Sequence, residues 1–345
     1  MPTIFDLVTA PELSSYWTEL NQDRQPYLGE TLFPNQKKLG LNLKWLKGSK
    51  GLPVTLKLSA LDAQAVPRTR IGFEKVSAEM PFFKESMYID EELRQELNKV
   101  LESGNETYID AILNRIFDDE TTLIDSAGVS RERMRMMLLT TGTIVIASNG
   151  QSYTYDYGLS EAQKPTVETS WSTATADIVG DIRTWQDERE DETGVRPTRA
   201  ICSRKTFGYI LNNTAIKNGV WGNSNTAPIN EAKAKQYLKD ELDLEVLVYT
   251  KRYKDEAGQT QKYVPDDTFV LLPAGDLGYT WFGTTPEESD LMASSAVDNV
   301  AIVDTGVAVT TMRHADPVTV ETKVSQISLP SFEAADQIVI ADVIQ

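Results

Sequence analysis

The residue types that carry out most enzymatic chemistry are scarce in this sequence. It contains one histidine, His314, and one cysteine, Cys202, among 345 residues. A single histidine excludes zinc sites built from two or three imidazoles, and a single cysteine excludes disulfide frameworks and multi-thiolate metal sites. No G-x-S-x-G nucleophile motif accompanies His314, and Cys202 lies in the apolar segment RAICS. We therefore predict a structural or surface histidine and a buried, inert thiol.

Acidic residues are the remaining candidates for metal binding or acid–base catalysis. Asp118, Asp119 and Glu120 are consecutive, as are Asp266 and Asp267, but neither group shows the D-x-[DN]-x-[DN]-G pattern of a calcium loop. Adjacent residues on a helix point about 100° apart, so neighbours alone cannot chelate one ion. We expect acids that face solvent or a partner, with no cofactor and no metal. A hydrolase that uses a carboxylate pair stays open as an alternative, because the pattern selects no pair and excludes none.

Composition and charge narrow the class of protein. The chain has 34 Lys and Arg against 51 Asp and Glu, a net charge of −17, and 41% hydrophobic residues. This is typical of a soluble globular protein of about two domains. Such an acid excess opposes binding of DNA across a whole face. No apolar run reaches the ~20 residues of a membrane helix, and the first residues lack a signal-peptide pattern, so we expect no membrane partner.

The charge is divided between two neighbouring blocks of opposite sign. Residues 36–76 have a net charge of +7, and residues 85–125 have a net charge of −9. Blocks of this kind favour an electrostatic contact, either by folding back within one molecule or between copies of the chain. A contact between copies would be head-to-tail and would close into rings or shells.

The basic block alternates between apolar and polar residues, as strands do. The alternation covers residues 41–46, 54–58 and 68–76, which predicts a long hairpin-like excursion. An isolated two-stranded ribbon is marginally stable in water, so this ribbon should lie on another surface. The acidic block instead has apolar residues at helical spacing, which predicts a long amphipathic helix over residues 107–140, with a kink at Gly128 left open.

The rest of the chain mixes helices and strands. Asn149-Gly150 between two alternating runs predicts a tight hairpin, and the polar residues 160–175 indicate a crossing into a second unit. There the sequence predicts a helix from the Asp177 cap to Gly194, a strand at 199–202, a helix at 205–211, a loop at 212–225, a helix around 234–242, strands at 244–253 and 261–273, and β structure at 306–312, 318–330 and 337–344. No regular βαβ rhythm is present, so we expect an α+β fold.

This order of elements, and six segments within it, resembles the lambda-type major capsid proteins of tailed bacteriophages, the phage major capsid protein E family. AVPRTRIGFEKVSAEMPFFKESMYI resembles the end of that family's extended loop, and IFDDETTLIDSAGVSRERMRMMLLTTGTIVI resembles its spine helix. SYTYDYG and SWSTATADIVGDIRTW resemble the passage into the axial domain. VPDDTFVLLP and RHADPVTVETKVSQISLPSFEAADQIVIADV resemble the last blocks. The resemblance runs from about Lys37 to the carboxyl end.

The resemblance implies a Hong Kong 97-like capsid fold and no catalytic residues. Its domains would be an N-terminal arm (1–36), an extended β-loop (37–86), a peripheral domain with the spine helix (87–169 and 301–345) and an axial domain (170–300). By analogy, the chain would assemble as hexamers and pentamers into an icosahedral shell around double-stranded DNA. A separate scaffolding protein, a portal and a decoration protein would be its partners. It would be located in the virion, after assembly in the host cytoplasm.

The two charge blocks supply the candidate contacts between subunits. We expect basic and aromatic residues of the ribbon to face acids of the long helix on a neighbouring copy. The basic set is Lys44, Trp45, Lys47, Lys57, Arg68 and Arg70, and the acidic set is Glu106, Asp110, Asp118 and Asp119. A tail-tube subunit would share this logic but form tubes, and the long helix argues against it.

Overall fold

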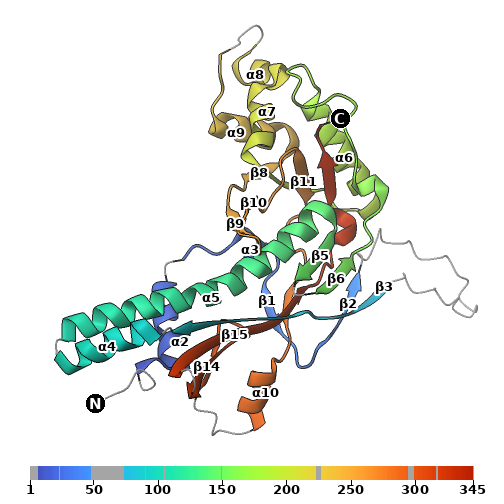
Figure 1. Ribbon diagram of the computed structural model, residues 1–345. Coiled ribbons are helices and arrows are strands. Elements are labelled where there is room, and N and C mark those ends of the chain that lie inside the picture. Colours follow the sequence, from blue (N-terminus) through green and yellow to red (C-terminus); the bar gives the residue numbers. More distant parts are fainter. Residues whose placement is uncertain are drawn as a thin grey trace, which may run out of the picture. The chain divides into compact units, whose positions relative to one another are not determined.

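The computed structural model describes residues 7–22, 24–47, 74–89, 91–103, 106–148, 150–222, 227–293, 299–315 and 318–344. It has the α+β architecture that the sequence predicts (Figure 1). The chain forms two compact units, each assembled from three segments. Unit 1 comprises Met1–Leu43, Ala78–Met134 and Tyr279–Ser331, and unit 2 comprises Lys44–Ser77, Arg135–Gly278 and Phe332–Gln345.

Unit 1 is organised around one long strand, β15 (Val318–Pro330). It pairs antiparallel with β14 (Val307–Ala315), with β4 (Phe82–Ile89) and, at its end, with β12 (Thr280–Phe282). The sheet is completed by β13 (Val300–Val303) beside β14 and β1 (Asn35–Lys37) parallel to β12. Nearly every side chain of β15 is buried. The β-branched residues of VTVETKVSQISLP suit a strand that is covered on both faces, and the expected tail strands are confirmed.

The long helix of the acidic block is α5 (Glu106–Thr141), which confirms the expected span. It is continuous through Gly128. A side chain built at Gly128 would make only ordinary contacts with Arg24 and Tyr27, so this glycine weakens the helix without interrupting it.

One face of α5 packs along β15 in regular register. Four residues advance a helix by about 6 Å and two residues advance a strand by about 6.6 Å, so the two elements stay in step over several contacts. Glu120 is hydrogen-bonded to Thr322 and the Ala127 carbonyl to Gln326, while Ile116 shares an apolar cluster with Val320 and Ile124 shares one with Val324.

Residues 10–32 of unit 1 include two helices, which the expectation of an arm over residues 1–36 did not include. Helix α2 (Ala10–Leu20) begins at Thr9, whose hydroxyl accepts the amide proton of Glu12, and α3 (Leu28–Leu32) follows. Ala10 and Leu13 are fully buried in a cluster with residues of β13, β14, β15 and α5. Helices α4 (Glu91–Ser103) and α10 (Pro286–Ala293) complete the unit.

Unit 2 contains a four-stranded sheet in the order β16 (Val339–Asp342), β11 (Thr268–Leu272), β7 (Arg199–Cys202) and β8 (Glu245–Val248). An apolar cluster packs against this sheet, and in it Trp171 stacks on Trp185 and contacts Phe269. The helices α6 (Ile178–Thr193), α7 (Arg204–Asn212) and α9 (Glu231–Leu242) contribute to that cluster. The Asp177 carboxylate caps α6 and Gly194 ends it at φ 74°, as the sequence predicts.

Two expectations for unit 2 are wrong. Residues 214–221 form helix α8 (Thr214–Trp221), not a loop, because the buried Asn213 accepts from the Ile216 amide and donates to the Ala176 carbonyl. The two long strands expected before and after Asp255 are each divided. The first becomes β8 and β9 (Arg252–Lys254), and the second becomes β10 (Thr260–Lys262) and β11, with β9 and β10 forming the hairpin.

Two small strand pairs follow the predicted pattern. Strands β5 (Thr143–Ser148) and β6 (Gln151–Asp156) pair with Ser148 opposite Gln151, which confirms the tight turn, and Gly150 has φ 74°. Strand β2 (Asn42–Lys47) pairs with β3 (Glu74–Glu79). The strand expected at residues 54–58 and most of the one at 68–76 lie outside the described residues. Short 3-10 turns occupy Glu161–Gln163 and Ala335–Gln337.

Candidate assembly interface

The described part of the basic ribbon has one exposed charge and one buried ring. Lys44 is exposed on β2, whereas the Trp45 side chain is only 7% exposed and its ring lies 5.6 Å from that of Tyr157. Trp45 therefore packs within its own subunit and has little surface left for a neighbour. Lys47 ends β2, but its side chain is outside the description, as are Lys57, Arg68 and Arg70.

The acidic candidates lie along the first half of α5. Glu106 begins the helix, with its side chain outside the description, and Asp110, Asp118 and Asp119 are exposed. They are within unit 1, on the part of the helix that precedes the buried Arg131. The exposed acids match the expectation of a solvent- or partner-facing stripe.

Asp118 already has a partner inside its own subunit. The Tyr16 hydroxyl of α2 donates to Asp118 Oδ1 at 2.7 Å, and the Trp17 indole donates to Asp125 Oδ1 at 3.0 Å. The hydrogen bond to Asp118 raises the pKa of Tyr16 above its ordinary value. Helix α2 thus binds two carboxylates one above the other on α5. Sequence reasoning missed this, although Tyr16 and Trp17 in a helix capped by Thr9 are a signal for it.

Glu120 does not belong to the exposed stripe. Its side chain is 1% exposed, and one carboxylate oxygen accepts from the Thr322 hydroxyl at 2.9 Å. The other carboxylate oxygen has no hydrogen-bond partner among the described residues. Burial raises the pKa of Glu120 to about 7, against the effect of the Thr322 hydrogen bond and with that of nearby Asp119. The expectation of a solvated acid is therefore wrong at this position.

A second buried charge fixes the middle of α5. The Arg131 guanidinium donates to Asp304 at 2.7 Å and to Gln326 at 2.9 Å, and it lies 5.2 Å from the centre of the Phe282 ring. Its side chain is 4% exposed. These contacts hold α5 against β15 and against the turn between β13 and β14 by geometry that only a planar, forked donor provides.

The two residues with potentially reactive side chains, His314 and Cys202, have structural surroundings. His314 Nε2 lies 2.7 Å from Glu321 Oε2. Burial alone would raise the pKa of Glu321, but hydrogen bonds from Ser86 and His314 outweigh it and lower that pKa. Cys202 is fully buried, and this burial raises the pKa of its thiol to about 12, which confirms the prediction of an inert thiol.

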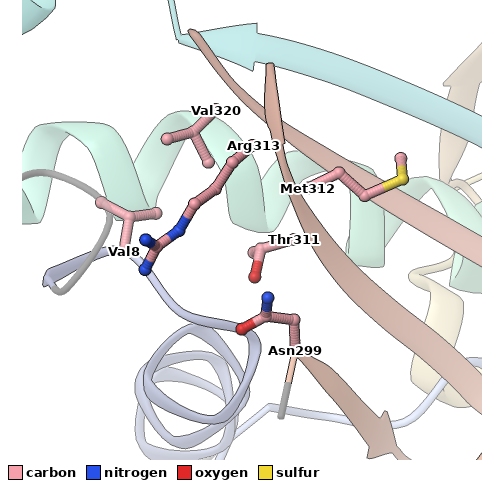
Figure 2. A pocket seen from close by; sticks show the side chains of 6 residues that line it. All are labelled: Val8, Asn299, Thr311, Met312, Arg313 and Val320. Atoms are coloured by element: carbon pink, nitrogen blue, oxygen red, sulfur yellow. The ribbon is translucent and has the colours of Figure 1, made fainter. Parts of the chain in front are cut away.

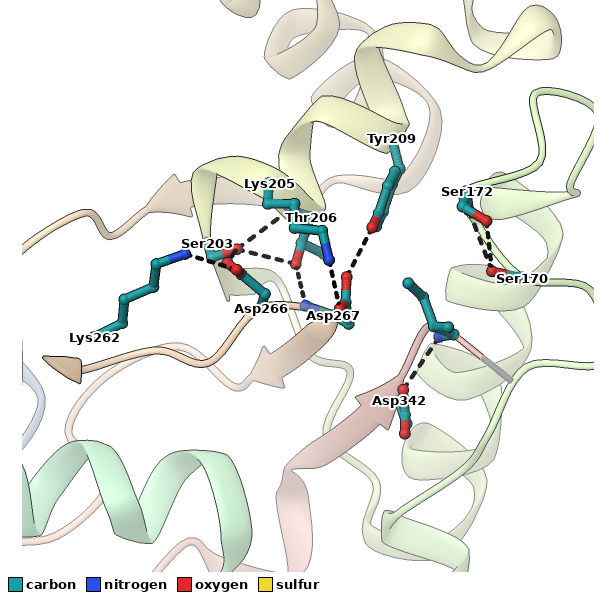
Figure 3. Close-up of polar contacts among 11 residues, drawn as sticks. Ser170, Ser172, Ser203, Lys205, Thr206, Tyr209, Lys262, Asp266, Asp267 and Asp342 are labelled. Atoms are coloured by element: carbon teal, nitrogen blue, oxygen red, sulfur yellow. Dashed lines mark hydrogen bonds and ion pairs between the residues drawn. The ribbon is translucent and has the colours of Figure 1, made fainter.

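The acids at 266 and 267 are also engaged. Figure 3 shows Asp266 between Ser203 and Lys262, and Asp267 facing Lys205, Thr206 and Tyr209. The Lys262 ammonium is 2.6 Å from Asp266, and the Lys205 ammonium and the Tyr209 hydroxyl are each 2.8 Å from Asp267. These contacts tie the start of α7 to the start of β11.

One small cavity of unit 1 has no room for a substrate. Figure 2 shows Val8, Arg313, Thr311 and Asn299 around a cavity of about 10 Å³, which is the size of a single water molecule. In the described ranges, no three His, Cys, Asp or Glu side chains are grouped as metal ligands. None of the helices in those ranges has the length and apolar character that crossing a bilayer requires.

Comparison with known proteins decides the family. A family model described as phage major capsid protein E matches residues 9–343. The chain belongs to the phage major capsid protein E family. Among curated protein sequences no significant match is found.

Solved structures share the fold of this capsid protein over almost its whole length. A protein assigned as the capsid protein of a prophage of E. coli CFT073 has a TM-score of 0.61 and 16% identity, covering 97% of this chain and 99% of that one. A phage-related protein from Bordetella bronchiseptica RB50 has a TM-score of 0.57 and 14% identity, covering 97% of both chains. The cyanophage A-1(L) capsid has a TM-score of 0.53 and 12% identity, covering 92% of both chains. The fold is the Hong Kong 97-like capsid fold, as the sequence resemblance implied.

Membership of the phage major capsid protein E family gives the exposed charges a context. Capsid proteins are structural proteins of the virion that associate with copies of themselves. Exposed Lys44, Asp110 and Asp119 are therefore candidates for contacts between copies, whereas Trp45 and Asp118 have partners within their own subunit.

Proposed function

We propose that this chain is the major capsid protein of a tailed bacteriophage and that its hexamers and pentamers form an icosahedral shell around double-stranded DNA. The observation that carries the proposal is the family match over residues 9–343. The structural likeness over at least 92% of the chain supports it. A carboxylate-pair hydrolase and a tail-tube subunit find no support in the arrangement of the described residues.

The segments of the subunit have different roles in this proposal. Residues 1–36 and 37–86 act as the arm and the extended loop, residues 87–169 and 301–345 as the peripheral domain, and residues 170–300 as the axial domain. The compact units group three segments differently, because residues 135–169 and 332–345 belong to unit 2 and residues 279–300 belong to unit 1. We propose that unit 1 carries the peripheral function and unit 2 the axial function.

The excess of acidic residues is consistent with a capsid that encloses DNA. A net charge of −17 on every subunit would keep packed DNA off the inner wall, because like charges repel. The protein would then enclose its genome without sequence-specific contacts. We further propose a separate scaffolding protein, a portal and a decoration protein as partners, and assembly in the cytoplasm of the host.

The proposal is tested by expressing the chain alone and with its scaffolding protein. Sucrose-gradient fractions are imaged by negative-stain electron microscopy. We expect closed shells, or rings of five and six subunits. A chain that remains monomeric even with the scaffold would contradict the proposed function.

Charge pairing between copies gives a sharper test. Reversing Lys44, Lys47 and Lys57 to Glu should lower the yield of closed shells by more than about tenfold while the subunit stays folded. Each exposed pair contributes only ~0.2–1 kcal/mol, but the contacts recur across the whole lattice. The same assembly should weaken at high salt, since exposed charges are screened.

A matched control keeps the change in net charge the same. A second triple variant replaces three lysines on other elements of unit 2 with Glu: Lys217, Lys239 and Lys254. The shell yields of the two triple variants are compared by gradient sedimentation. The control should retain shells. Equal yields from both triple variants would remove the charge-pairing idea and leave the capsid function untouched.

A further inference from the structure

A neutral apolar groove lies on unit 1, beside the end of β15. Its volume is about 570 Å³. Leu39 and Leu41 line one side, Met292 of α10 lines another, and Phe82 and Ile327 of the paired strands β4 and β15 complete it. Its polar lining residues are Thr284, Thr285 and Ser289, and no charged residue lines it.

Exposed apolar side chains of the described ranges are concentrated at the groove. In the ranges that the structure describes, twelve large apolar side chains are exposed, and four of them line this groove. Leu39 is 72% exposed and Met292 is 63% exposed. Contiguous apolar surface of this kind marks interaction sites on soluble proteins.

The backbone around the groove is held in place. The Lys37 ammonium donates to the Gly283 carbonyl at 3.0 Å, and the Met80 amide donates to the Leu41 carbonyl at 2.9 Å. Gly283 is packed so closely that a Cβ there would lie 2.6 Å from Ile327 and 2.9 Å from the Gly40 carbonyl oxygen. The groove is therefore preformed, which lowers the entropic cost of covering it.

The charges beside the groove are compensated. Glu287 and Glu288 of α10 pair with Lys323 at 2.6 Å and with Lys37 at 2.5 Å. Two further charges are exposed, Asp290 of the same helix and Lys84, which lies over the Phe82 ring. A chain with a net charge of −17 repels its own copies over most orientations, so a neutral apolar face is where two copies can meet without that repulsion.

We propose that a second copy of this chain covers the groove in a groove-to-groove contact. Leu39 and Met292 line the groove and are largely exposed, so a two-fold contact between copies would bury the apolar lining of both grooves at once. A basic partner would instead seek the exposed acids of α5. The inference deepens the proposed shell function and rests on it, but it assigns a specific surface that the charge pairs do not include.

Charged substitutions at the two protruding residues test the contact. Leu39→Glu and Met292→Glu should each raise the concentration needed for self-association by roughly tenfold or more, because each places a charge in a buried apolar contact. Leu20→Glu is the matched control, since Leu20 is 57% exposed on α2 and does not line the groove. Association is measured by sedimentation velocity and by shell yield, and circular dichroism checks the fold.

A mixing experiment identifies the occupant. Leu39→Glu copies mixed with Met292→Lys copies should associate better than either variant alone, because one copy's carboxylate then meets the other copy's ammonium. Normal assembly of both Glu variants would overturn the inference while leaving the capsid function standing. Loss of association without rescue by mixing would also overturn it, because a different partner would then cover the groove. Groove-dependent dimers without shells would support the contact and count against the shell.

Discussion

Replacing Arg131 with alanine should lower the free energy of unfolding of unit 1 by about 3–5 kcal/mol. The substitution removes a buried guanidinium that binds Asp304 and Gln326. Both partners then lose a hydrogen bond, and a cavity is left between α5 and the sheet. Because the chain has two compact units, a single melting curve would mix them. The loss of stability in unit 1 is therefore measured by hydrogen–deuterium exchange of peptides from α5.

Two variants separate the causes. Arg131→Met fills most of the space without the charge, so it should recover part of the loss and show how much comes from the cavity. Arg115→Ala, on the exposed side of the same helix, should change stability by less than about 0.5 kcal/mol. If Arg131→Ala exchanges as slowly as the Arg115 variant, the network contributes little and our interpretation is wrong.

Replacing Glu120 with glutamine should stabilise unit 1 above neutral pH and have little effect in acid. The folded state holds the pKa of Glu120 at about 7, against an ordinary value of 4.5. A raised folded-state pKa means that the folded state binds the proton more tightly. The stability is thus fully present below pH 4.5 and falls as the pH rises toward 7. The difference corresponds to about 3 kcal/mol of unfolding free energy.

The measurement is the difference between the wild type and Glu120→Gln across pH 5 to 8, again by exchange in α5. The wild type should lose stability relative to the variant as the pH rises across this range, because its carboxyl ionises more readily in the unfolded state, and the variant should be clearly the more stable at pH 8. Asp119→Asn is the control, because Asp119 is the exposed neighbour on the same helix. A difference that does not change with pH would contradict the buried-acid interpretation.

Elements with strong local signals were predictable from sequence. The α5 span, the Asp177 cap with Gly194 at the other end, and the Asn149-Gly150 hairpin all depend on residues within one turn or one hairpin. Helix α8 was not predicted, because its Asn/Gly-rich sequence suits a loop. It forms because Asn213 is buried and bonds to the Ala176 carbonyl, a contact that only the tertiary fold supplies.

The candidate interface was also only partly predictable from sequence, because tertiary contacts decide which acids are exposed. Composition located the basic and acidic blocks, but charge alone does not say which acids are free. Asp118, Asp119 and Glu120 are adjacent in sequence, yet one binds Tyr16, one is exposed and one is buried against Thr322. Helical periodicity separates their directions. The partners on α2 and β15 come from distant segments of the chain, so the sequence of the acidic block alone does not reveal them.

The pairing of β4 with β15 has a consequence for synthesis on the ribosome. Ile89 of β4 lies opposite Val320 of β15, so β4 emerges long before its partner is translated. The sheet of unit 2 also waits, because β16 at Val339–Asp342 pairs with β11. Neither sheet can close on a nascent chain, and such distant pairings fold slowly and leave unpaired edges open to aggregation. A product terminated before Val318 would lack the central strand of one sheet and an edge strand of the other. Both sheets can therefore be completed only after β15 and β16 have been translated.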